Sequence, residues 1–282
     1  SALMLVIVHF SDRRALGSPA SSGVLGRWIV YVLLVAAVSG VVTFYLARTG
    51  LRSLDVSDIA MRACIVCGVC FMTGIYEEAL FRVLAINAFV RAFVSKDRKP
   101  DVSSQDASAF YASRVTYASN PAVSRVSSAS VSPAVSPYSP VASPAALSAK
   151  TSPAFKAALI SALLFAFLHI SVTGITSAYA MVQLQTVIKF IQTALFGFIM
   201  AAFYVRTRSV WLVALLHAVF DILYLGPVML TLGIPSSLVT NEPLNLILLA
   251  ITSALLVAPA VTAAQVLNEA DSYELAGEAT GK

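Results

Sequence analysis

The sequence predicts an all-α protein: a polytopic transmembrane helical bundle of six to eight spans, with a disordered loop inserted in it. The first observation is composition, because 58% of the residues are hydrophobic and only 12% are charged, whereas soluble domains carry about a quarter charged residues. The second is that apolar runs recur at about the 20-residue length that crosses the hydrocarbon core of a bilayer. The third is a long polar stretch without helical or strand periodicity, which separates two groups of these runs.

Six apolar segments are expected to span the membrane. In chain order they are residues 28–46, 59–93, 155–170, 187–205, 210–232 and 244–266. The N-terminal apolar run 1–10 and the more polar stretch 171–185, which is typical of a re-entrant or interfacial connection, would raise the count to seven or eight if they also insert. Lys189 lies near one end of its span, where a long side chain can snorkel to the interface. Gly197 and Ala201, four residues apart, predict a close helix–helix approach.

Residues 101–153 differ sharply from the apolar segments. They consist mainly of Ser, Ala, Val and Pro, with repeated Ser-Pro pairs. Such a segment cannot bury enough apolar surface to offset the entropy of ordering it, so we expect a disordered spacer. The chain then divides into N-terminal spans with the first motif (1–100), the loop (101–153), the remaining membrane core (154–267) and a polar tail (268–282).

The positive charge of the chain indicates membrane topology rather than nucleic-acid binding. Net charge is +5, but the basic residues cluster between the apolar runs. With six spans, the N-terminus, the long loop, Arg206, Arg208 and the C-terminus share one side, which carries most of the Lys and Arg. The positive-inside rule places that side in the cytoplasm. We therefore expect an integral protein of a bacterial cytoplasmic membrane with lipids as its surroundings.

Ionisable side chains within the apolar segments are the main functional signal, because each is costly to place in a membrane. They are Glu77, Glu78, Arg82, His169, His217 and Asp221. One such group can be structural, but six of complementary type predict a built site.

The helical spacing of these residues predicts which of them pair. Glu78 and Arg82 are four residues apart with the acid first, the favourable order for an ion pair on one helix face. That pairing leaves Glu77, about 100° further round the helix, free to react. His217 and Asp221 are also four residues apart and are expected to project together.

Two kinds of chemistry fit this set. A carboxylate and an imidazole facing one cavity can deprotonate water, and a second imidazole can stabilise an oxyanion, which suits peptide-bond hydrolysis. The same groups can also bind Zn²⁺, so Glu77, His169, His217 and Asp221 are candidate metal ligands as well. The absence of a His-Glu-x-x-His motif argues against the geometry of soluble zinc proteases.

Four motifs in order resemble those of the CPBP family, the CAAX proteases and bacteriocin-processing enzymes. Residues 77–82 match the family's Glu-Glu-x-x-x-Arg motif, and residues 165–169 are similar to its Phe-x-x-x-His motif. Residues 196–211 resemble its third conserved region, and residues 217–221 match its His-x-x-x-Asn/Asp motif. The resemblance covers about residues 63–225 without the loop.

The resemblance implies a helical intramembrane endopeptidase with a polar cavity open toward the cytoplasm. Carried over by position, Glu77 and His169 would activate the hydrolytic water, while His217 and Asp221 would bind the oxyanion. In the prenyl-protein proteases of the family the substrate is a prenylated C-terminal tail. The resemblance favours metal-free chemistry without a cofactor.

The resemblance also implies that Glu78 and Arg82 hold the motif helix in place. The sequence departs from the prenyl-protein proteases at Asp221, where they carry Asn. An ionised Asp accepts hydrogen bonds but cannot donate one, so it would need a proton, or orient His217, or bind a metal. The long loop between the first two motifs is a second departure. The fold should tolerate it, because the entropic cost of closing a loop grows only slowly with its length.

The predicted function is hydrolysis of a peptide bond near the C-terminus of a membrane-associated peptide or lipidated protein. Two alternatives remain. Intramembrane Glu and His residues also form the relays of proton-coupled transporters, although no inverted repeat is evident here. The other alternative is a non-catalytic scaffold or immunity protein of the same fold.

Overall fold

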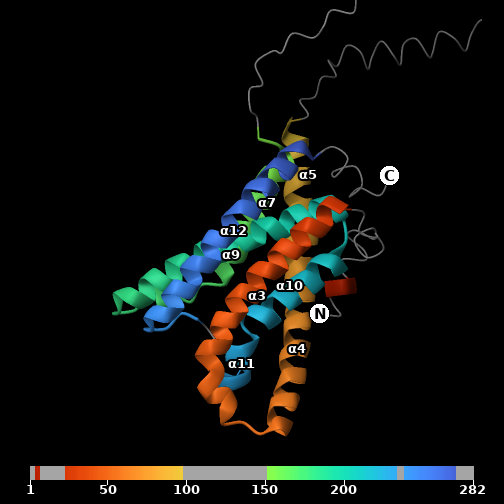
Figure 1. The fold of residues 1–282 in the computed structure, drawn as a ribbon. Coiled ribbons are helices and arrows are strands. Elements are labelled where there is room, and N and C mark those ends of the chain that lie inside the picture. The colour runs from red at the N-terminus through yellow and green to blue at the C-terminus, as the bar shows by residue number, and fades with distance from the viewer. Residues whose placement is uncertain (1–3, 7–22, 98–150, 234–237, 271–282) are drawn as a thin grey trace, which may run out of the picture. The chain divides into compact units, whose positions relative to one another are not determined.

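The computed structural model describes residues 4–6, 23–97, 151–233 and 238–270, and these residues form helices joined by short connections, with no strand among them (Figure 1). The predicted all-α class is thus confirmed. Contacts divide the chain into one compact unit within Ser1–Val94 and Thr151–Lys282 and a second, Ser95–Lys150. Most of the predicted loop, the tail beyond residue 270 and most of the N-terminal run lie outside the described residues.

The larger unit contains nearly all of the described helices, which keep the order of the predicted apolar segments. They are α3 (Gly23–Arg52), α4 (Val56–Glu78), the π-helical segment η1 (Ala79–Ile86), α5 (Asn87–Asp97), α7 (Pro153–Leu168), α8 (Val172–Ile175), α9 (Ala180–Thr207), α10 (Val210–Tyr224), α11 (Gly226–Leu232) and α12 (Pro243–Glu269).

Length and composition identify fewer spans than the sequence predicted. Four of the described helices are long and apolar enough to cross a membrane, or five if α10 and α11 count as one bent span. All six predicted segments are helical, but α7 has only 16 residues. By contrast, Val56–Lys96 is continuous over 41 residues, about twice the length that a bilayer core requires.

The predicted span 210–232 is broken rather than continuous. Helix α10 ends at Tyr224, and α11 continues at an angle of 60°. Pro227 explains the break, because proline lacks the backbone N–H and its ring clashes with the carbonyl four residues earlier, while both effects are tolerated in the first turn of a new helix. The predicted connection 171–185 is also shorter than expected, since α9 already begins at Ala180.

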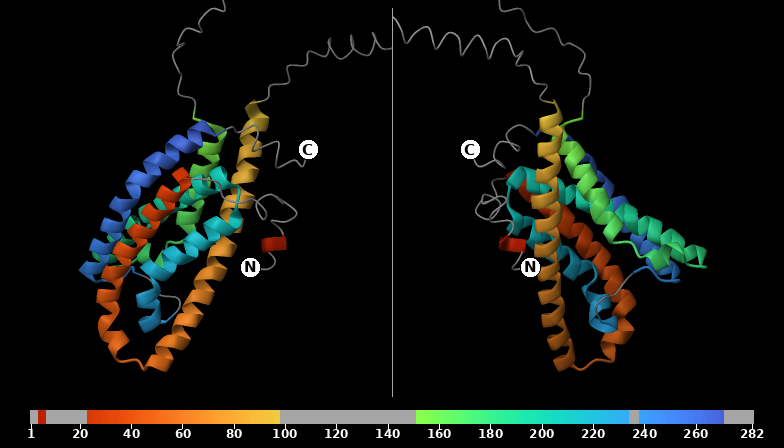
Figure 2. Two further views of the ribbon diagram at one scale, coloured as in Figure 1. Left: turned by 45° about the vertical axis from the view of Figure 1, so that its right-hand side comes forward. Right: turned by 180° about the vertical axis from the view of Figure 1, so that it is seen from behind.

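The arrangement of the helices brings α4, α7, α9 and α10 together around one region (Figures 1 and 2). Helices α3 and α4 diverge from the short turn that joins them, and α10 packs against both (Figures 1 and 2). Helix α12 runs beside α9, which also packs against α7. Phe165 of α7 lies at this junction: it is 1% exposed, and its ring lies near those of Phe196 in α9 and His217 in α10.

Glycines allow the close approaches between these helices. A Cβ atom on Gly74 of α4 would lie 2.6 Å from the Ala214 carbonyl oxygen of α10, and one on Gly197 of α9 would lie 3.0 Å from the Phe165 ring. The predicted close approach at Gly197 is therefore confirmed, and α7 is the partner. Small residues serve this purpose widely in membrane bundles.

The π-helical segment η1 continues α4 directly after Glu78. Wider winding leaves backbone groups that need other partners, and the Phe81 carbonyl accepts a hydrogen bond of 2.7 Å from the Ser161 hydroxyl of α7. Beyond η1, Asn87 donates to the Tyr204 hydroxyl at 3.2 Å and accepts from Arg208 at 3.2 Å. The segment thus joins the first motif helix to both α7 and α9.

Candidate active site

Glu78 and Arg82 form a fully buried ion pair beneath the cavity-lining residues. Both side chains are 0% exposed, and Arg82 Nε donates to Glu78 Oε2 at 2.9 Å. The guanidinium also donates to Ser161 at 3.4 Å and lies 4.8 Å from the Phe165 ring centroid, a cation–π distance. Gly197 leaves room for it, because a Cβ there would lie 3.4 Å from Arg82 Nη2. The predicted pairing of these two residues is confirmed.

Glu78 also holds His217, a contact between helices that the sequence did not predict. Its Oε1 lies 2.7 Å from His217 Nδ1. The imidazole is 3% exposed, and its faces and edges meet Phe196 and Phe165 at centroid distances of 5.1 and 5.9 Å. Because Nδ1 faces Glu78, the ring directs Nε2 into the site.

Glu77 lies between the two imidazoles. Its Oε1 is 3.6 Å from His169 Nε2, and its Oε2 is 3.6 Å from His217 Nε2. Oε2 is buried and makes no hydrogen bond to any described residue. Both distances exceed those of direct hydrogen bonds and suit bridging by water. The expectation that Glu77 stays free of the ion pair is confirmed.

His169 caps the C-terminal end of α7. Its Nδ1 is 2.8 Å from the Phe165 carbonyl oxygen, and its ring lies 4.2 Å from that of Phe165. A carbonyl can only accept, so Nδ1 carries a proton, and the neutral ring presents an unshared electron pair at Nε2 toward Glu77. The 28% exposure of its side chain places His169 at the mouth of the site.

Asp221 lies one turn beyond His217 on α10. Its Oδ2 is 3.4 Å from His217 Nε2, so the predicted pair projects together. The side chain is 22% exposed, which leaves one carboxylate face toward the cavity. The six ionisable residues singled out from the sequence therefore meet in one place.

These residues surround a cavity of about 80 Å³, which Glu77, His169, His217 and Asp221 all line. The volume exceeds the roughly 10–15 Å³ that a single water needs in this measure. The cavity can therefore hold several waters beside Glu77.

Lys189 of α9 also lines this cavity, so the prediction that it snorkels away is wrong. Its Nζ donates to Gln192 Oε1 at 3.2 Å and lies 5.7 Å from the Tyr224 ring centroid. Because a charged side chain is costly in an apolar span, Lys189 could have been predicted as a site residue on the same ground as the acids.

No three His, Cys, Asp or Glu side chains in the described part of the chain are placed to hold one metal ion. In each imidazole Nδ1 is engaged, by Glu78 in His217 and by the Phe165 carbonyl in His169, which leaves Nε2 of both rings directed at Glu77.

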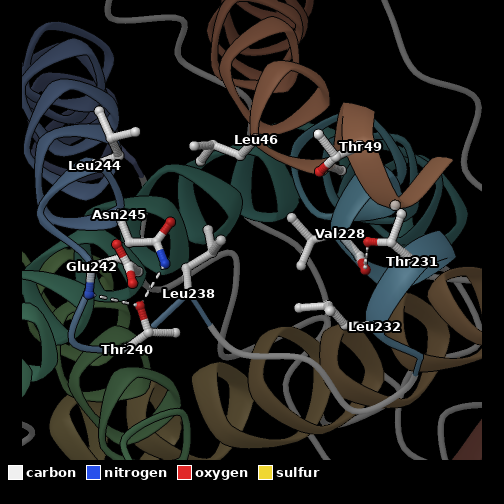
Figure 3. A pocket seen from close by; sticks show the side chains of 12 residues that line it. Leu46, Thr49, Val228, Thr231, Leu232, Leu238, Thr240, Glu242, Leu244 and Asn245 are labelled. Carbon is white, nitrogen blue, oxygen red and sulfur yellow. Dashed lines mark hydrogen bonds between the residues drawn. The ribbon is translucent and has the colours of Figure 1, made fainter. Parts of the chain in front are cut away.

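A larger cavity of about 450 Å³ lies elsewhere, between the end of α3, α11 and the start of α12 (Figure 3). Its lining is mostly Leu, Val and Thr, and Thr240 accepts hydrogen bonds from the Glu242 backbone and the Asn245 amide. Of the described residues that line it, Glu242 alone is ionisable. Size therefore does not mark the reactive site in this protein.

A family model for type II CAAX prenyl endopeptidases, described as Rce1-like, matches residues 59–223. This match covers more than half of the chain and includes Glu77, His169, His217 and Asp221. No curated protein matches the chain, and no solved structure does. Apolar helices long enough to cross a bilayer agree with such an enzyme. The chain therefore belongs to the Rce1-like family of type II CAAX prenyl endopeptidases and is an integral-membrane peptide hydrolase.

Proposed function

We propose that this enzyme hydrolyses a peptide bond near the C-terminus of a prenylated, membrane-associated substrate, with Glu77 and His169 activating the water. The observation that carries the proposal is the position of Glu77, 3.6 Å from Nε2 of each imidazole. The family match supports the class of reaction.

The neutral His169 ring, with its hydrogen on Nδ1, determines how the water is oriented. A water between the Glu77 carboxylate and the unprotonated Nε2 of His169 meets two acceptors, so it donates a hydrogen to each. Its own electron pairs then point outward, toward a substrate carbonyl. Glu77 takes the proton as the water attacks the carbonyl carbon and later delivers it to the leaving amine.

His217 is the proposed oxyanion donor. Glu78 accepts from Nδ1–H at 2.7 Å, so a protonated ring can donate from Nε2–H to the oxygen that becomes negative in the transition state. Asp221 beside it accepts only, and its proposed role is to orient His217. Glu78 and Arg82 fix the ring through their buried ion pair.

The test is hydrolysis of a farnesylated C-a-a-X peptide by the purified protein in lipid nanodiscs. Glu77→Gln should lower kcat by about 10²–10⁴-fold, the contribution of a general base. Glu242→Gln is the matched control, because this exposed carboxylate lines the larger cavity instead. Its rate should equal that of the original enzyme.

Equal rates for Glu77→Gln and the unsubstituted protein would contradict the assignment and leave a scaffold of the same fold. The same assay tests our further proposal that the water is activated without a metal. Activity should survive exhaustive treatment with a strong chelator. Loss of activity that returns only on adding Zn²⁺ would overturn metal-free chemistry.

We propose that the end of the bundle at which α7 begins and α12 ends faces the cytoplasm. Ser152 at the start of α7 bonds to Asn268 and Leu267 at the end of α12, so the two lie at the same end of the bundle. That end adjoins the residues expected from the positive-inside rule to be cytoplasmic.

A further inference from the structure

Lys189 brings a cation into the catalytic cavity from α9, a helix that supplies none of the acids or imidazoles. No carboxylate among the described residues lies within ion-pair distance of its ammonium group. Its recorded partner is the neutral Gln192 amide, at 3.2 Å. A lysine ammonium has three donors, so donors remain for an anion in the cavity.

Buried neutral groups fix the position of this ammonium group. Gln192 is 2% exposed, and its Nε2 donates to the Tyr224 hydroxyl at 2.9 Å. That bond turns the amide oxygen toward Lys189. The Tyr224 ring is also buried, and its face lies 5.7 Å from the ammonium. An ionised group within a membrane segment is costly unless it meets a partner. Glu77 and Asp221 line the same cavity but lie beyond ion-pair distance of the ammonium, so an anionic ligand can bind it directly.

The spacing along α10 gives the distance between His217 and Tyr224, the residue whose ring lies near Lys189. Tyr224 follows His217 by seven residues, which is about 10 Å along a helix axis. Three extended peptide residues also span about 10 Å. In a C-a-a-X sequence three residues follow the prenylated cysteine. A chain end three residues beyond a carbonyl at His217 therefore reaches as far as Tyr224, and the Lys189 ammonium lies 5.7 Å from the ring of Tyr224.

We propose that Lys189, held by Gln192 and Tyr224, binds the free C-terminal carboxylate of the substrate and so sets how far from the chain end the enzyme cuts. The inference rests on the proposed function, since it takes the scissile carbonyl to lie at His217. It names the substrate class more closely: a peptide with an uncapped C-terminus.

Two peptides that differ only at the chain end test the inference: a farnesylated C-a-a-X peptide with a free acid, and the same peptide as its amide. The unsubstituted enzyme should prefer the acid by about 10- to 100-fold in kcat/KM, the range expected for a hydrogen bond to a charged group. Lys189→Met should abolish this preference by raising KM for the acid. Lys189→Arg should retain part of it.

The Glu77→Gln protein gives a readout without turnover. It keeps Lys189 and should bind the acid peptide more tightly than the amide. The thermal transition of Lys189→Met confirms that the variant is folded. Equal kcat/KM values for the acid and the amide in the unsubstituted enzyme would overturn the inference. An equal fall of kcat for both peptides in Lys189→Met would also overturn it and would assign the lysine to the reacting atoms. If the unsubstituted enzyme cleaved neither peptide, the proposed function would fail first.

Discussion

Asp221 is the residue at which this site departs from the prenyl-protein proteases that the sequence resembles. Its carboxylate oxygen lies 3.4 Å from His217 Nε2, and an ionised carboxylate can hold that N–H but cannot donate to an oxyanion. Glu78 already holds the other ring nitrogen. A carboxylate at each end of the imidazole fixes the orientation of the ring, which suits the proposed oxyanion role.

Replacement of Asp221 distinguishes its proposed role in orienting His217 from the effect of its negative charge. In Asp221→Asn the amide oxygen still accepts from His217 and the amide nitrogen gains the ability to donate, so kcat should stay within about tenfold. Asp221→Ala removes both and should lower kcat by about 10²-fold. Steady-state hydrolysis of the farnesylated peptide measures both effects. An asparagine variant as slow as the alanine variant would show that the negative charge itself is required.

At the scale of single helices, side-chain pairs within a helix could be predicted, whereas the partner of a side chain on another helix could not. The 3.6-residue period was enough to pair Glu78 with Arg82 and His217 with Asp221. It says nothing about which neighbouring helix a side chain meets. The Glu78–His217 bond and the entry of Lys189 into the cavity therefore emerged only from the packing of α4, α9 and α10.

Two glycines of α4 provide a matched test of helix packing. A Cβ on Gly74 would lie 2.6 Å from the Ala214 carbonyl, three residues before His217, whereas a Cβ on Gly68 meets nothing within 4 Å. Gly74→Ala should force α4 away from α10, with a cost of about 1–3 kcal/mol for overpacking. It should also lower kcat, because Glu77 and His217 lie on the separated helices.

Gly68→Ala should keep full activity and match or exceed the original stability, since alanine is the better helix former. Thermal unfolding in detergent and peptide hydrolysis measure the two quantities. If both alanine variants behaved alike, the close approach at Gly74 would not control the site.

At the scale of the whole molecule, hydropathy predicted the helical bundle because a bilayer leaves few other ways to satisfy the backbone. The number of spans was harder to predict, because hydropathy does not register the bend after Tyr224 or the shortness of α7. The predicted loop falls in the separate unit Ser95–Lys150, while Val94 and Thr151 belong to one compact unit.

Exchange of residues 101–150 for a flexible Gly/Ser linker of about 20 residues tests whether the loop is a spacer. Such a linker has a typical end-to-end distance of roughly 25 Å, and loop-closure entropy changes only slowly with length. Both the thermal transition and the rate of hydrolysis should be retained. Loss of hydrolysis with an unchanged thermal transition would show that the loop takes part in binding the substrate.

The eight-residue π-helical segment acts as one inserted residue would in an ordinary helix, and so it shifts the phase of everything downstream. Upstream, Glu78 faces α10; downstream, Asn87 meets Tyr204 of α9 at 3.2 Å. Deleting a single residue from η1 would restore regular winding and turn α5 by about 100°. Glu77 and Glu78, which precede η1, would keep their orientation, whereas Asn87 would turn away from Tyr204. A one-residue deletion here would therefore break the contact with α9 and leave the acids of the site in place.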